Sequence, residues 1–92
     1  MDFVKGQLVR SLAGRDKTRT FAVMAVEGQM LSLADGSLRK VSRPKAKKIR
    51  HVAPTATVLR EEILADDTQL SEAIRAYDAD TPCKLTRREE LV

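Results

Sequence analysis

The stretch QLVRSLAGRDKTRTFAVMAV, residues 7–26, decides how the front half of this chain folds. It contains two runs rich in apolar and β-branched residues, 7–12 and 20–26, separated by a polar gap with Gly14 near its start. Such runs favour strands, and a short polar gap that contains glycine favours a turn between them. We therefore expect two antiparallel strands joined by a turn.

Three more short strands are expected before residue 54. Asp35-Gly36 is a hairpin signal, because glycine accepts a positive φ and aspartate tolerates it. Pro44 should end the strand that follows this turn, since proline cannot donate to a ladder. These expected strands are 30–34, 37–42 and 49–52. Five short strands with tight turns in about fifty residues favour a small closed or half-closed β-barrel.

The chain changes character beyond Pro54. Two helical patterns follow, with apolar stripes made of Val58, Leu59 and Ile63, and then of Leu70, Ala73, Ile74 and Tyr77. Thr57 is the expected cap of the first helix, and Asp67 or Thr68 of the second. Thr86-Arg-Arg-Glu89 resembles a capping box and predicts a last short turn of helix. We expect a barrel at 1–54 followed by an acidic helical tail at 55–92.

The helical tail needs a surface to cover its apolar stripes. Both faces of the second strand are apolar, because Ala22 and Met24 alternate with Phe21 and Val23. That strand should be covered on two sides. The tail therefore docks either on the outer face of this strand or on a partner protein.

Charge is divided unevenly along the chain. Residues 1–53 hold 12 Lys and Arg against 4 Asp and Glu, and residues 54–92 hold 5 against 9, so the net charges are +8 and −4. A basic patch confined to one module indicates a polyanionic partner, whereas a solvated charged surface is the alternative explanation.

The cations fall mainly into two clusters. Arg15, Lys17 and Arg19 should project from the first turn, where Asp16 is the sole neighbour that could neutralise them. The second cluster runs from Arg43 to His51. If the barrel places it near the first turn, the two would form one phosphate-binding surface. The residues expected to contact nucleic acid are Gly14, Arg15, Lys17, Arg19, Arg39, Lys40, Arg43, Lys45, Lys47, Lys48, Arg50 and His51.

Residues 6–23, GQLVRSLAGRDKTRTFAV, resemble a KOW motif, which occurs in several large-subunit ribosomal proteins and in transcription elongation factors. With LADGSLRKVSRPKAKKIRHVAPT they resemble small bacterial KOW-domain proteins grouped with a eukaryotic and archaeal large-subunit ribosomal protein family. The likeness covers roughly residues 3–57, whereas the tail matches in general character alone. It implies a small SH3-like barrel and RNA binding.

This chain departs from the resemblance at Thr18, where related sequences carry glycine. A β-branched residue with positive φ is costly. We therefore expect either a different type of turn or a displaced tip.

Three aromatic residues, Phe3, Phe21 and Tyr77, are too few to build a platform for stacking bases. This favours recognition of folded RNA by shape and phosphate contacts, and the resemblance adds ribosomal RNA as the target and the ribosome as the setting. The alternative is a protein-interaction adaptor of the transcription or translation machinery that acts through the barrel and the tail.

We expect neither catalysis nor a cofactor. Cys83 and His51 lack companions at the spacing that nucleophilic or metal chemistry requires. A single cysteine, the lack of a signal-peptide pattern and the lack of an apolar run of ~20 residues favour a cytoplasmic protein away from membranes.

Overall fold

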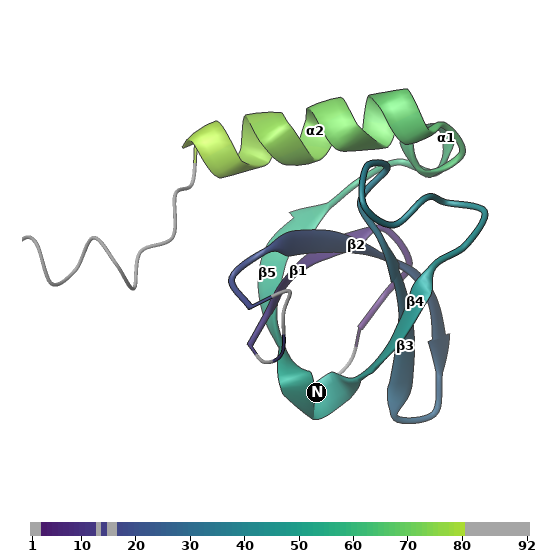
Figure 1. Cartoon of the computed structure of the whole chain (residues 1–92), viewed down its shortest axis with the longest axis vertical. Coiled ribbons are helices and arrows are strands. Elements are labelled where there is room, and N and C mark those ends of the chain that lie inside the picture. Colours follow the sequence, from purple (N-terminus) through teal and green to yellow (C-terminus); the bar gives the residue numbers. More distant parts are fainter. Residues whose placement is uncertain (1–2, 13, 15–16, 81–92) are drawn as a thin grey trace, which may run out of the picture.

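The computed structural model describes residues 3–12, 14 and 17–80, except for the side chain of residue 80 (Figure 1). This part of the chain is mainly β, with helices at its C-terminal end. The strands are β1 (Gln7–Ser11), β2 (Thr20–Glu27), β3 (Met30–Ala34), β4 (Lys45–Lys48) and β5 (Val52–Val58). They form one antiparallel sheet with the order β4-β3-β2-β1-β5.

The sheet is strongly curled, and a short 3-10 helix, η1 (Ile49–His51), leads directly from β4 to β5 (Figure 1). Because β4 and β5 are the two edge strands, η1 crosses the open side of the curl. No ladder joins β4 to β5 within the described residues. The sheet is therefore open rather than a closed barrel.

An inner core fills the concave side of the sheet. Val9 of β1, Phe21 and Val23 of β2, and Leu31 and Leu33 of β3 are each at most 1% exposed. Apolar side chains at alternate positions of each strand point to the same face, so these residues meet inside the curl. Phe3, Val52 and the half-buried Ile49 complete the cluster.

A second core lies on the outer face of the sheet, under the helices α1 (Glu61–Leu64) and α2 (Asp67–Asp80), which run across β2 (Figure 1). Its buried members are Leu8, Ala22, Ala34, Leu64, Leu70 and Ile74. The expectation that β2 is covered on both faces is confirmed. Of the two candidate covers, the structure places the chain's own tail on this face.

The strand expected at 37–42 is wrong, and β4 lies instead within the segment expected to be a basic loop. The Oδ1 atom of Asp35 accepts hydrogen bonds from the backbone N–H groups of Ser37, at 2.9 Å, and Arg39, at 2.8 Å. These two donors are thus satisfied inside a loop, which competes with a ladder for the same groups. Residues 35–44 consequently form a loop between β3 and β4.

The expected strand at 49–52 is also wrong, since residues 49–51 form η1 and Val52 begins β5. β5 runs through Pro54 and across the expected boundary between residues 54 and 55. An edge strand tolerates proline, because one side of its backbone needs no partner. The strand continues to Val58, so the first helix begins at Glu61 and not after Thr57.

The cap of α2 lies one residue before the expected position. The Oδ1 atom of Asp66 accepts a hydrogen bond from the Thr68 N–H at 3.2 Å, and the Asp66 carbonyl accepts one from Leu70 at 2.9 Å. Asp67 has a different role, because its Oδ1 accepts the Val41 N–H at 2.7 Å and ties the 35–44 loop to the helix. The capping box at 86–89 lies outside the described residues.

No helix in the part of the chain that the structure describes is both long and apolar enough to cross a membrane.

Gly36 is where the 35–44 loop touches α2. Its φ is +77°, and a Cβ added there would collide with the carbonyl oxygen of Asp67 and lie 2.9 Å from the Ser71 nitrogen. Gly28, in the turn between β2 and β3, also has a positive φ of +62° but no atom within 4 Å of such a Cβ.

We predict that Gly36→Ala lowers the free energy of unfolding by about 2 to 3 kcal/mol, because it adds a backbone collision to the cost of positive φ. Gly28→Ala is the matched control and should cost about 1 kcal/mol, which is the φ cost alone. Urea unfolding of both variants measures the difference. Equal losses would show that the contact between the loop and α2 is not tight.

Candidate nucleic-acid interface

Two of the predicted cations, Lys45 and Lys47, face the inner side of the sheet. They pair in register with Leu33 and Leu31, and directly paired residues of an antiparallel ladder share a face. Both leucines belong to the inner core, so the lysine stems run along its rim. Both lysines are half-buried, and neither points away from the sheet like a free surface side chain.

Lys47 joins the two predicted clusters. Its Nζ lies 3.8 Å from the position that a Cβ on Gly14 would occupy. A second link comes from η1, where the carbonyl of His51 accepts a hydrogen bond from the Leu12 N–H at 2.9 Å. The basic second cluster therefore lies beside the first turn, as the sequence analysis required for one continuous surface.

We name this region the turn–β4 surface. It consists of Gly14, Lys17, Lys45, Lys47, Arg50 and His51. Lys17 and Arg50 are exposed, and His51 is half-buried. Arg15, the remaining predicted cation of the first turn, lies outside the described residues.

Thr18 adopts the costly positive φ that led us to expect a different type of turn or a displaced tip. Thr18 has a φ of +72°, in the left-handed region that glycine prefers. Its N–H donates to the Ser11 carbonyl at 2.8 Å, and its own carbonyl accepts a hydrogen bond from Arg10 Nη1 at 3.1 Å. These bonds hold the threonine in a conformation that it would otherwise avoid.

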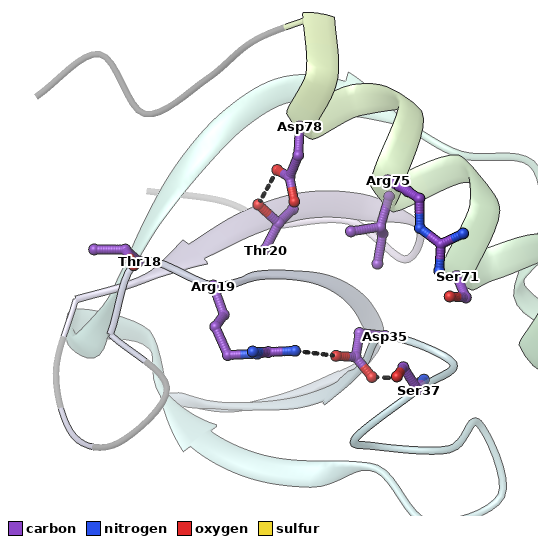
Figure 2. A pocket seen from close by; sticks show the side chains of 9 residues that line it. Thr18, Arg19, Thr20, Asp35, Ser37, Ser71, Arg75 and Asp78 are labelled. Atoms are coloured by element: carbon purple, nitrogen blue, oxygen red, sulfur yellow. Dashed lines mark hydrogen bonds and ion pairs between the residues drawn. The ribbon is translucent and has the colours of Figure 1, made fainter. Parts of the chain in front are cut away.

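Arg19 does not project freely from the tip, as the sequence analysis expected. Its Nη2 lies 3.7 Å from Oδ2 of Asp35, whose side chain is 6% exposed (Figure 2). Burial makes an unpaired carboxylate costly, so Asp35 needs this cation as well as its two backbone donors. Arg19 therefore helps to hold the 35–44 loop, and 45% of its side chain stays exposed.

The other predicted cations that the structure describes lie outside the turn–β4 surface. Arg39, Lys40 and Arg43 are exposed in the 35–44 loop instead of on a strand. Lys48 is exposed and pairs with Met30, so it faces away from Lys47. The structure thus brings together the turn–β4 surface and leaves Lys48 on the opposite face.

A pocket of about 320 Å³ lies where the first turn leads into β2. Figure 2 shows its wall built from three segments: the start of β2, the loop after β3, and α2. Here Thr20 Oγ1 donates to Oδ1 of Asp78 at 2.7 Å, and Arg10 Nη2 lies 3.7 Å from the same oxygen. These contacts fasten the C-terminal half of α2 to β1 and β2.

Sequence reasoning missed Arg10, Ser71 and Arg75. Ser71 and Arg75 are four residues apart on α2 and so share one of its faces, which is a signal that the sequence does carry. The sequence does not show which segment of the chain this face of α2 packs against.

No protein-family model matches the chain, and a search of curated proteins finds no significant match.

We predict that Thr18→Gly raises the free energy of unfolding by about 0.5 to 1 kcal/mol, because glycine removes the strain at positive φ but loses more entropy on folding. Thr18→Ala keeps a Cβ at the positive φ, so its free energy of unfolding should rise by less. Thermal unfolding of the three proteins measures the order. A Thr18→Gly variant no more stable than Thr18→Ala would contradict the strain argument.

Proposed function

We propose that this protein binds folded RNA, without catalysis, through phosphate contacts made by the turn–β4 surface. The observation that carries the proposal is the position of Lys47 Nζ, 3.8 Å from where a Cβ on Gly14 would lie, because it brings together two cationic segments that are far apart in the sequence. Gly14 has no side chain, so a phosphodiester backbone can come close to the turn there. Lysines at the rim then supply point charges along that path.

The positions of the aromatic residues support contact with the backbone over base stacking. All three aromatic residues of the chain lie in its described part. Phe3 and Phe21 are buried in the inner core, and Tyr77 packs against the second core. Two of the three rings are therefore closed to a splayed base and the third is half-buried, whereas single-strand readers require open ring faces. Recognition by shape and phosphate position follows from this.

The proposal includes an SH3-like barrel of the KOW type. Its support is the strand order β4-β3-β2-β1-β5, together with a 3-10 turn that connects the two edge strands. The resemblance of residues 3–57 to KOW-domain proteins adds ribosomal RNA, and the large ribosomal subunit, as the proposed target. The adaptor alternative would act through the barrel and the tail, and it is less favoured because Leu70 and Ile74 of the tail stripe are buried against the chain's own sheet.

We predict that Lys17→Glu combined with Lys47→Glu weakens binding to purified large-subunit ribosomal RNA by about tenfold or more near 0.1 M salt. The matched control is Lys5→Glu combined with Arg60→Glu. It changes the net charge equally, on exposed residues away from the turn–β4 surface. Lys5 pairs with Glu61 at 3.0 Å, but both side chains are exposed, so that bond contributes little.

Filter binding at several salt concentrations measures this difference. The control variant should keep the affinity and the salt dependence of the wild-type protein. Equal losses of affinity in both double variants would mean that net charge alone attracts the RNA. That result would contradict binding through the turn–β4 surface.

Sedimentation tests the proposed setting. The tagged protein in cell lysate should migrate with the large ribosomal subunit in a sucrose gradient, and high salt or ribonuclease should release it. A protein that stays at the top of every gradient would contradict the ribosomal target but not RNA binding itself.

A further inference from the structure

We propose that a groove between α2 and the 35–44 loop holds a second stretch of the RNA backbone. This inference rests on the proposed function and extends it to the acidic tail. The groove, named here the α2 groove, is formed by two adjoining pockets of about 320 and 260 Å³. Both are lined by Ser37, Ser71 and Arg75, so the two pockets lie next to each other.

The carboxylates of the larger pocket are already engaged within the chain. Asp35 accepts two backbone N–H groups and pairs with Arg19. Asp78 accepts the Thr20 hydroxyl and pairs with Arg10. Their charges are thereby offset locally, so that neither carboxylate forms a bare negative wall.

Within the described part of the chain, two cations of the groove have no such acidic partner. Among the described residues, no carboxylate oxygen lies within 4.0 Å of the Arg75 guanidinium or the Lys40 amine. Both side chains are exposed, and they line the groove from α2 and from the loop respectively. Glu72 is the remaining acidic side chain of the lining. Once the two paired carboxylates and the arginines that pair with them are set aside, the remaining charged side chains of the groove are Lys40, Arg75 and Glu72, and their net charge is positive.

The groove also offers hydrogen-bond donors that suit phosphate oxygens. Ser37 and Ser71 line the groove from its two walls, and Figure 2 shows Ser71 beside Arg75 and Ser37 beside Asp35. An arginine fork flanked by hydroxyls matches a backbone phosphate, which needs several donors and no base-specific contact.

The first turn contributes residues both to the groove and to the turn–β4 surface. Lys47 lies at the Gly14 end of the first turn, and Thr18 and Arg19 line the groove at its other end. A polyanion crossing the first turn therefore meets cations on both sides of it. The RNA backbone would run from β4, past the turn, to α2.

The test compares Arg75→Gln with Arg60→Gln, an exposed arginine of the tail that lines neither pocket. We expect Arg75→Gln to weaken binding of large-subunit ribosomal RNA about eightfold near 0.1 M salt. The slope of log K against log salt should fall by about 0.9, which corresponds to one lost phosphate contact. Arg60→Gln should change neither.

Two more variants test whether a loss of binding comes from the removed charge or from a local folding defect in Arg75→Gln. Lys40→Gln removes the cation on the opposite wall and should reproduce the loss, whereas Glu72→Gln removes the repelling charge and should strengthen binding. If Arg75→Gln binds like Arg60→Gln, the inference is overturned, whatever Lys40→Gln does. Wild-type protein that fails to bind the RNA would instead overturn the proposed function, so the two failures are distinguishable.

Discussion

The burial of β2 on both faces is the constraint on which the rest of this structure depends. Phe21 and Val23 fill the curl of the sheet, while Ala22 lies under the helices. Removal of both faces from water needs a second layer, and a domain of 92 residues has little other apolar surface to offer. The small side chains of Ala22 and Ala34 let α2 approach closely. Docking of α2 is therefore part of the fold, and with it comes a polar groove along the helix.

The first turn and the 35–44 loop are each held by one strongly engaged side chain. Asp35 collects two N–H groups and the Arg19 guanidinium, and Arg10 spans from the Thr18 carbonyl to Asp78. The first turn is also held by backbone hydrogen bonds to β1, since the Thr18 N–H donates to the Ser11 carbonyl at 2.8 Å. Rigid loops carry cations at a lower entropic cost on binding than flexible ones. The strain at Thr18 is tolerated in this setting because the bonds on both sides of it are fixed by the sheet.

How much the sequence could predict varies with the range of the interaction. β1, β2 and β3 were predicted closely, because alternating apolar residues and glycine turns are local signals. β4 was missed, since KAKK has no strand signal of its own and forms a strand by pairing with β3. The sequence left open whether the second cluster lies near the first turn, and the curl of the sheet brings Lys47 there. Pairing of Arg19 with Asp35 and the contact of Gly36 with α2 were beyond prediction, because each depends on where a distant element docks.

An acidic tail folded onto a basic module would be expected to weaken its attraction for a polyanion. The placement of charge on α2 reduces this effect. Asp78 faces the sheet and is paired by Arg10, and Asp67 is turned to the Val41 N–H. Arg75, by contrast, lies on the exposed side beside the groove. Exposed charges farther apart than about 8 Å are largely screened at physiological salt, so local placement outweighs the sum over the segment. The sign of the field along the groove is thus set by a few side chains, and a helix with a net negative charge can still present a cationic edge.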